Sequence, residues 1–380
     1  MGVARYFAAG HVGVIAEIGT SHGGDRGRAR ELIDAAADAG ADIVKTQVVY
    51  ADEIVHPKTG AVELPGGAIP LFERFRELEV EPDFFADMAR HCLDRGVAFL
   101  ASCFGPRSLQ VVGRIGVDTV KIASPELNHA PLLKLLRETG LAAILSTGVS
   151  TLADIERAVE TAGRPGDGGN GGNGGNGGSA GSAIMHCVTA YPAPEEDYNL
   201  RVIGNLAAVI GVPVGVSDHS RHPELVPAAA VAVGARAVEK HFTLSRSGDG
   251  LDDPIALEPA EFSAMVRAIR RVEHRPPEEA LEELGSRFGE ARVARILGDG
   301  VKRLAPSEQR NYGRSNRSIL ATRDIAAGEP IGDDNAAALR SEQNLEPGLS
   351  PFHWDDIRGA RAARDIADGS GIRWEHLLAR

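Results

Sequence analysis

Eight short runs of apolar, mostly β-branched residues recur along the first two thirds of this 380-residue chain, separated by stretches of helical periodicity. Continuous apolar strands that alternate with helices indicate a parallel sheet covered on both faces. This α/β pattern favours a closed (β/α)8 TIM barrel over an open doubly wound sheet, because no glycine-rich dinucleotide turn follows the first strand. The predicted strands are 12–17, 43–47, 98–103, 119–124, 142–147, 183–187, 214–218 and 237–241.

Polar residues gather where these predicted strands end. In TIM barrels the catalytic side chains come from the carboxyl ends of the strands, so we expect an enzyme whose site lies at that face. The strand-end residues are Glu17, Lys45, Gln47, Ser102, Lys121, Ser124, Ser146, Thr147, His186, Asp218, His219, Lys240 and His241.

Changes in composition divide the chain into three parts. The barrel is predicted to span 1–285, including a Gly/Asn-rich stretch at 164–181. That stretch has too little apolar surface to order itself, so we expect a flexible surface loop; the alternative, a lid over the site, would need side chains that touch the substrate. A charged linker is predicted at 286–312 and a small β-rich domain at 313–380.

The formal net charge is −12, and no block of Lys and Arg interrupts it. The surface therefore repels polyanions, and we expect no nucleic-acid partner. An anionic substrate would have to be bound by a few local cations and backbone amides.

Three cysteines, Cys92, Cys103 and Cys187, are odd in number and far apart, so neither a disulfide framework nor a zinc site is predicted. Residues 1–20 lack a basic segment leading into an apolar run, and no stretch approaches the ~20 apolar residues of a membrane span. We expect a cytoplasmic protein that is neither exported nor inserted into a membrane.

Two histidines, His219 and His241, follow the seventh and eighth predicted strands. A single strand-end histidine is usually a hydrogen-bonded structural residue. Two of them on neighbouring strands predict a divalent metal site, because neutral imidazoles are common ligands and water completes the shell.

Two lysines, Lys45 and Lys121, end the second and fourth predicted strands, close to the hydroxyls of Ser124, Ser146 and Thr147. Each lysine alone could be solvated or paired with a carboxylate. Together with the hydroxyl donors they indicate a site for a phosphate or carboxylate substrate.

One carboxylate, Glu17, ends an otherwise buried strand, where an unpaired charge is costly. A structural salt bridge to Lys45 is one interpretation. The other is acid/base chemistry, or the orientation of a reacting hydroxyl.

The ordered motifs resemble the sialic acid synthase family, which condenses phosphoenolpyruvate with an aldose to give nonulosonic acids. The resemblance extends into the C-terminal segment, which is similar to the family's antifreeze-like (SAF, β-clip) domain. The motifs are 16–19 with His22, 44–47, 120–124, 145–148, 186–187 with 191–194, 217–219, 239–243 and 257–259, then 316–319, 324–325, 328–329, 339–340 and 347–351.

The resemblance implies roles for individual residues. His219 and His241 look like ligands of Mn²⁺ or Mg²⁺, and Glu17, Lys45 and Lys121 look like catalytic residues. The expected phosphoenolpyruvate contacts are Lys45, Lys121, Ser124, Ser146, Thr189 and Ser217, and the expected aldose contacts are Gln47, Tyr191, Asp252 and Arg340. In the family the C-terminal domain caps the partner's barrel, so a domain-swapped homodimer is implied, with Arg340 supplied by the partner chain.

Departures from the family pattern lie on the sugar side, at Ser21, Gly23, Thr46, Thr189, 250–254 and 340–342. They leave the identity of the aldose open, including a different aldehyde in a specialised pathway. Two rivals remain: a barrel aldolase that forms a Schiff base with pyruvate through Lys45 or Lys121, and a non-catalytic protein that kept the fold.

Overall fold

The computed structural model describes residues 2–7, 10–64, 67–163 and 183–377. In this part of the chain eight parallel strands close into a barrel in the order β1-β10-β9-β8-β7-β6-β5-β2, which confirms the predicted TIM barrel. The strands are β1 Gly13–Gly19, β2 Ile43–Gln47, β5 Ala98–Cys103, β6 Thr119–Ile122, β7 Ala142–Ser146, β8 Ala183–Cys187, β9 Val214–Asp218 and β10 Ala237–His241.

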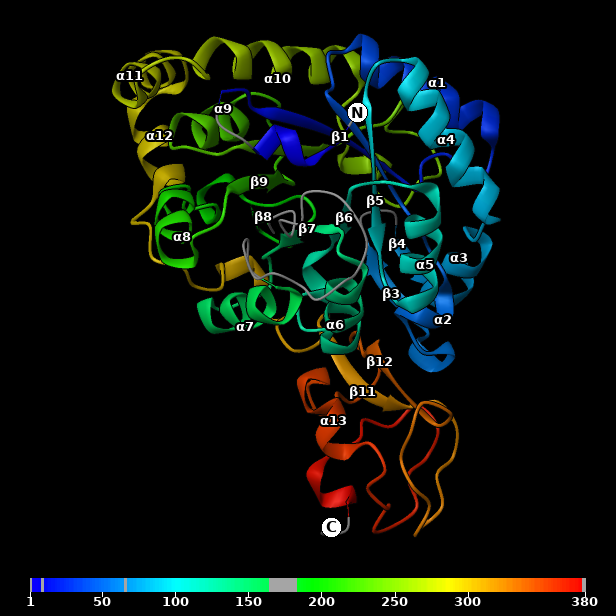
Figure 1. Cartoon of the computed structure of the whole chain (residues 1–380). Helices are drawn as coiled ribbons and strands as arrows, with labels where there is room; N and C mark the ends of the chain where they lie inside the picture. Colours follow the sequence, from blue (N-terminus) through cyan, green and yellow to red (C-terminus); the bar gives the residue numbers. More distant parts are fainter. Residues whose placement is uncertain (1, 8–9, 65–66, 164–182, 378–380) are drawn as a thin grey trace.

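Helices surround the barrel (Figure 1). Local sequence sets their ends: the side chain of Asp25 accepts a hydrogen bond from the backbone N–H of Arg28 at the start of α1, and Thr151 and Asp154 cap each other at the start of α7. The helices are α1 Arg26–Asp38, α2 Ala51–Ile54, α3 Leu71–Glu77, α4 Pro82–Asp94, α5 Pro106–Ile115, α6 Ala130–Thr139, α7 Leu152–Ala162, α8 Val202–Ile210, α9 Leu225–Ala232, α10 Pro259–Val272, α11 Pro277–Phe288, α12 Glu290–Leu297 and α13 Trp354–Ile357.

The inside of the barrel is apolar at its amino-terminal end. Side chains there form a core cluster that the N-terminal turn closes with Val3, Tyr6 and Phe7. Because strand side chains alternate between faces, residues two positions further along each strand also point inward. The inward apolar residues are Ile15, Ile43, Ala98, Leu100, Ile144, Ala183, Met185 and Ala237.

The observed elements differ from the predicted ones at several places, two of them between β2 and α6. A hairpin of β3 Ala61–Leu64 and β4 Gly67–Pro70 lies between β2 and α3 and was not predicted, because its four-residue strands are too short for a clear alternation. The fourth barrel strand ends at Ile122 and not at residue 124, because Pro125 enters a 3-10 turn at Ser124–Glu126.

Residues 286–312 were expected to form a linker, and they include α12 and the end of α11. Val293, Ile296, Leu297 and Ala305 belong to the same hydrophobic core as the barrel. This segment is therefore packed along the barrel wall. The Gly/Asn-rich stretch at 164–181 lies outside the described residues.

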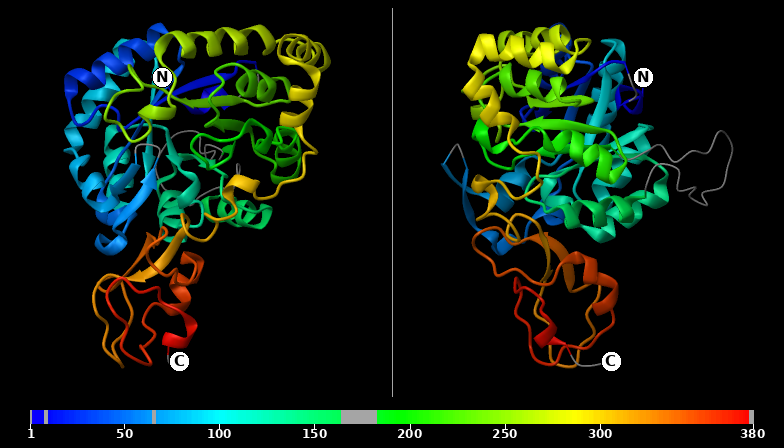
Figure 2. Two further views of the ribbon diagram at one scale, coloured as in Figure 1. Left: turned by 180° about the vertical axis from the view of Figure 1, so that it is seen from behind. Right: turned by 90° about the vertical axis from the view of Figure 1, so that its left-hand side faces the viewer.

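A C-terminal domain projects from one end of the barrel (orange to red in Figures 1 and 2). It is built on the antiparallel pair β11 Arg317–Ala321 and β12 Ala336–Arg340, with further isolated β-bridges. It has a core of its own, so the predicted small β-rich domain is confirmed. The core includes Ile319, Ile325, Ile331, Trp354, Ile357, Ile366 and Ile372.

The three cysteines are free and buried. Within the described ranges, no helix has both the length and the apolar character that crossing a membrane requires.

Candidate active site

A layer of charged side chains lies inside the barrel, next to the apolar core cluster and on its carboxyl-terminal side. Lys121 Nζ lies 2.9 and 2.8 Å from the two carboxylate oxygens of Glu239. Lys45 Nζ lies 2.9 Å from Glu17 Oε2 and 3.4 Å from Glu239 Oε1. The hydroxyl of Ser217 donates to Glu239 Oε1 at 3.0 Å. Four predicted residues therefore converge, and Glu239 joins three of them.

Glu239 was not among the residues predicted to form the site. A signal was available, because Glu239 lies two positions before His241 on the same strand and therefore shares its inward face. Ser102 was noted only as a strand-end residue, and its Oγ accepts a hydrogen bond from Lys45 Nζ at 3.2 Å. Ser146 is buried two positions after the inward-facing Ile144, so it belongs to the same layer.

The charges in this layer balance, because two lysines face two carboxylates. Burial alone lowers the pKa of a lysine, but Glu17 and Glu239 outweigh it at Lys45 and raise that pKa. At Lys121 burial outweighs the attraction of Glu239, and the pKa is lowered. Burial opposes ionisation of Glu239, yet Lys121 and Lys45 hold its pKa below the ordinary value. The Glu17–Lys45 ion pair is the structural interpretation of Glu17; its role in acid/base chemistry stays a prediction.

The rings of His219 and His241 lie side by side, with centroids 5.5 Å apart. Nδ1 of His219 lies 2.9 Å from the carbonyl oxygen of Val188, to which it must donate, so Nε2 is left as the acceptor. Burial lowers the pKa of both imidazoles, which favours the neutral form that binds metals.

The His219–His241 pair is the candidate donor set for a metal ion. No group of three or more His, Cys, Asp or Glu side chains in the described ranges is arranged to hold a metal ion. Asp252 Oδ2 lies 3.8 Å from His241 Nδ1. The pair fits a divalent ion only if water or substrate oxygens supply the remaining ligands.

Residues predicted to contact the aldose surround the histidine pair. The ring of Tyr191 stacks on His219 with centroids 4.3 Å apart and an interplanar angle of 27°, and it is 40% exposed. Gln47 Nε2 donates to Glu17 Oε1 at 2.9 Å. These side chains lie between the charged layer and the solvent at the carboxyl-terminal end of the barrel.

Two hydroxyls of the predicted phosphate site, on Ser124 after β6 and on Thr189 after β8, meet at Gly148 in the loop after β7. The backbone N–H of Gly148 donates to Ser124 Oγ at 3.0 Å. A Cβ atom on Gly148 would overlap Thr189 Oγ1 and lie 2.9 Å from Ser124 Oγ. Only glycine therefore lets the two hydroxyls approach this closely.

Arg340 lies against the barrel of its own chain in this structure, and its supply by a partner chain in a homodimer stays a prediction. Its Nε and Nη2 atoms lie 2.9 and 2.6 Å from Glu126 Oε1. Arg317 Nη2 binds the same oxygen at 3.0 Å. Residues 298–316 stay on the barrel that they follow, and this chain path brings Arg340 to Glu126.

Glu126, which is fully buried in the 3-10 turn after β6, was also not predicted to belong to the site. Its proximity to Ser124 in the string Ser-Pro-Glu was the available signal. Burial lowers the pKa of Arg340, but Glu126 outweighs burial and raises it.

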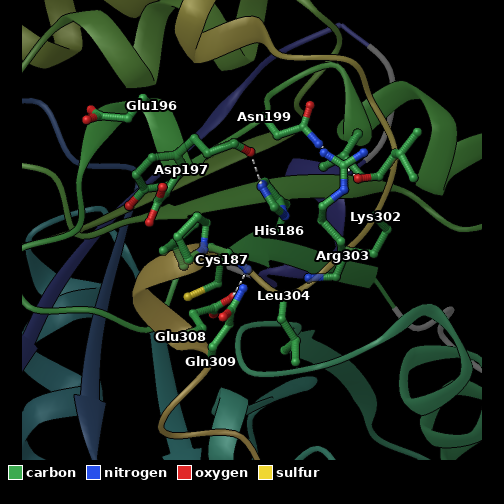
Figure 3. Close-up of a pocket in the computed structure, with 16 residues that line it drawn as sticks. His186, Cys187, Glu196, Asp197, Asn199, Lys302, Arg303, Leu304, Glu308 and Gln309 are labelled. Atoms are coloured by element: carbon green, nitrogen blue, oxygen red, sulfur yellow. Dashed lines mark hydrogen bonds between the residues drawn. The ribbon is translucent and has the colours of Figure 1, made fainter.

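A cavity of about 260 Å³ lies beside this site, between β8 and residues 301–309 (Figure 3). It shares Cys187 and Val188 with the site, whereas Lys45 and Lys121 do not line it. His186 Nε2 lies 2.6 Å from the carbonyl oxygen of Tyr198, and burial lowers its pKa to about 3. His186 was noted at a strand end, and its side chain faces away from the barrel interior.

Comparison with known proteins agrees with this geometry. The chain is similar to spore coat polysaccharide biosynthesis protein SpsE of Bacillus subtilis, with 35% identity over 97% of this chain and 94% of that protein. The crystal structure of that SpsE matches with a TM-score of 0.80 and 34% identity, covering 98% of this chain and 97% of the other.

Two further relatives are named synthases. N,N'-diacetyllegionaminic acid synthase of Campylobacter jejuni is 29% identical over 95% of this chain and 98% of its own length. N-acetylneuraminate-9-phosphate synthase of Drosophila melanogaster is 30% identical over 96% of this chain and 95% of its own length.

Family models match both parts of the chain. The model described as the NeuB family matches residues 32–278, and the model of the SAF domain matches residues 316–378. The predicted resemblance to the sialic acid synthases is thereby confirmed. Since the first match spans well over half of the sequence, this chain belongs to the NeuB family and carries a C-terminal SAF domain.

Proposed function

We propose that this chain condenses phosphoenolpyruvate with an N-acylated aldose similar to N-acetylmannosamine, and with water, to give a nonulosonic acid and phosphate. The observation that carries the proposal is the buried Lys45–Glu239–Lys121 layer beneath the His219–His241 pair, in a member of the NeuB family. Two of its relatives bear the names of nonulosonic acid synthases.

The donor would bind in the charged layer. Lys45 and Lys121 would meet its phosphate and carboxylate, because an anion needs local cations in a protein whose net charge is −12. The hydroxyls of Ser124, Ser146, Thr189 and Ser217 would supply hydrogen bonds. Fixed donors of this kind act mainly by positioning and by electrostatic stabilisation of the charge that develops in the transition state.

His219 and His241 would hold the divalent ion, Mn²⁺ or Mg²⁺, through two neutral imidazoles. When bound, such an ion supplies Lewis acidity toward the aldehyde oxygen. Stacking by Tyr191 and the hydrogen bond to the carbonyl of Val188 keep the His219 ring in one orientation.

In the reaction, C3 of phosphoenolpyruvate forms a bond to the aldehyde carbon, and cationic character develops at C2. Water adds at C2, and phosphate leaves with cleavage of the C–O bond. Lys45 and Lys121 neutralise the departing phosphate. Glu17, fixed by Lys45 and Gln47, is the group we assign to proton transfer or to orientation of the reacting hydroxyl.

The aldose would lie between Gln47, Tyr191, Asp252 and Arg340. We propose that Arg340, paired with Glu126, faces the acyl group of the sugar. A homodimer in the cytoplasm remains part of the proposal, and the own-chain position of Arg340 makes exchange of the C-terminal domain testable separately.

The decisive experiment is phosphate release from phosphoenolpyruvate by the full-length protein with added Mn²⁺. Acceptors to be compared are N-acetylmannosamine, its 6-phosphate and 6-deoxy diacetamido hexoses. Acceptor-dependent release supports the proposal, and its absence with all of them contradicts it.

The Schiff-base alternative calls for a different result. If Lys45 or Lys121 formed an imine with pyruvate, borohydride would trap a covalent adduct on that lysine. We expect no adduct, because both ammonium groups are held by carboxylates.

A further inference from the structure

Val149, in the loop after β7, has a backbone conformation that a β-branched residue rarely adopts. Its φ is 43°, and its side chain is fully buried. A non-glycine residue with positive φ persists only where its surroundings hold it, and such residues concentrate at functional sites.

The segment after α12 holds this loop from outside. Glu308 Oε1 accepts the backbone N–H of Val149 at 2.7 Å, and Asn316 Nδ2 donates to the Val149 carbonyl at 3.3 Å. Lys302 Nζ donates to the carbonyl of Thr147 at 3.1 Å. Both polar backbone groups of Val149 are therefore bound by residues more than 150 positions later in the chain.

Glu308 also holds the loop after β8. The same Oε1 accepts the backbone N–H of Thr189 at 2.8 Å, while Oε2 accepts that of Ala305 at 3.1 Å. The residue is 1% exposed. Figure 3 shows it next to Cys187 on the wall of the cavity, so one carboxylate joins two barrel loops to the segment that packs over them.

Thr189, in the loop after β8, and Ser124, in the turn after β6, carry hydroxyls that we assign to phosphate binding, and both lie against Gly148 in the loop after β7. Gly148 precedes Val149 and donates to Ser124 Oγ, and its Cα lies too close to Thr189 for any side chain. A shift of the loop at Val149 would therefore move Gly148 and displace the Ser124 and Thr189 hydroxyls that lie against it.

We propose that Glu308 is a positioning residue for the phosphate end of the site. This inference rests on the proposed function, because it takes Ser124 and Thr189 as phosphate donors. Glu308 acts only through the two loops. The expected effect is a loss of affinity for phosphoenolpyruvate that exceeds the loss for the aldose.

A carboxylate suits this position because it accepts three N–H groups and donates none. In Glu308→Gln the amide oxygen still accepts from Val149 and Thr189, but the amide nitrogen faces the N–H of Ala305. The variant should therefore retain much of the positioning that Glu308→Ala loses.

The matched control is Glu273→Ala. The side chain of Glu273 is also largely buried and accepts a backbone N–H, from Val12 at 3.1 Å, but it lies at the opposite end of the barrel. It therefore reports the loss of a buried carboxylate without any effect on the loops after β7 and β8.

Two readouts are needed on the full-length proteins. Hydrogen exchange of peptides that cover 147–151 and 187–191 tests whether Glu308 holds the loops, without any substrate. Steady-state phosphate release then gives KM for phosphoenolpyruvate and for the aldose. In Glu308→Ala we expect faster exchange in both peptides and a rise in KM for phosphoenolpyruvate on the order of 10- to 100-fold, with Glu308→Gln between it and wild type.

Unchanged exchange in Glu308→Ala would overturn the proposal whatever the enzyme does. Equal rises in both KM values, or the same rises in Glu273→Ala, would also overturn it, because they indicate a general loss of stability. If wild-type protein released no phosphate while the exchange still responded, the proposed function would fail and the loop-holding role would stand.

Discussion

The side chains of Lys121 and Glu239, which are 118 residues apart in the sequence, form a buried ion pair with Nζ 2.9 and 2.8 Å from the two carboxylate oxygens. Glu239 also lies 3.4 Å from Lys45. This carboxylate keeps two ammonium groups in place inside the barrel before any substrate enters.

We predict that Glu239→Gln destabilises the protein by about 3–5 kcal/mol, because it leaves a buried ammonium without its counter-charge. Urea unfolding at neutral pH measures this loss. The control is the double variant Lys121→Met with Glu239→Leu, which should recover most of the stability but no activity. Unchanged stability in Glu239→Gln would contradict the role of this ion pair.

Metal dependence should follow the histidine pair. We expect a chelator to abolish phosphate release and added Mn²⁺ to restore it, and we expect His219→Ala or His241→Ala to abolish both activity and tight Mn²⁺ binding. His186→Gln is the control, because that buried imidazole faces away from the barrel interior. Full activity of either alanine variant without metal would refute the assignment.

Removal of Arg340 tests the sugar side of the site. Arg340→Ala should raise KM for the aldose more than KM for phosphoenolpyruvate, because Arg340 approaches Tyr191 and Glu126 and not the two lysines. Equal effects on both substrates would argue against the assignment.

Co-expression of two impaired variants tells which chain supplies Arg340. If each C-terminal domain serves its own barrel, co-expression of Arg340→Ala with Lys121→Ala restores no activity above that of the separate variants. In a domain-swapped dimer, one of the two sites in each heterodimer would be intact. The domain-swapped homodimer implied by the family predicts restoration, whereas the own-chain contacts of Arg340 predict none, and phosphate release distinguishes the two.

Gly148→Ala should weaken phosphoenolpyruvate binding, because the added Cβ would displace the Thr189 and Ser124 hydroxyls. We expect KM for phosphoenolpyruvate to rise on the order of tenfold or more. Gly113→Ala in α5 is the control, since a Cβ there meets no atom within 4 Å and should change stability by less than about 1 kcal/mol. Identical kinetics of the two variants would rule out close packing around Gly148.

Acid should destabilise the protein below about pH 6.5, because buried histidines resist protonation. Burial, with a smaller contribution from Arg28, lowers the pKa of His22 to about 4, and burial lowers that of His186 to about 3. Between these values and 6.5 the unfolded state binds more protons than the folded state, so stability falls as pH falls, by about 1.4 kcal/mol per pH unit for each imidazole.

Unfolding measured between pH 6 and pH 5 checks this slope. His22→Gln and His186→Gln should each flatten it by roughly that amount. Slopes equal to the wild-type slope in both variants would mean that these imidazoles are protonated in the folded protein.

Local patterns predicted much of this protein. Apolar runs and helical periodicity identified all eight barrel strands, and their positions at the ends of these strands placed Glu17, Lys45 and His241 at the carboxyl face of the barrel. The C-terminal domain was predicted from the return of short strand-like runs. These signals are local, because the direction of a side chain on a strand depends only on its own neighbours.

Other features were decided only by the tertiary structure. Closure of the barrel brings Glu239 between Lys121 and Lys45, and the path of residues 298–316 brings Glu308 onto Val149 and Arg340 onto Glu126. Such pairings join residues separated by a hundred or more positions, and the buried charge is tolerated only because its partner arrives from another strand or domain. The sequence by itself determined which side chains face inward, whereas long-range packing decided which of them meet.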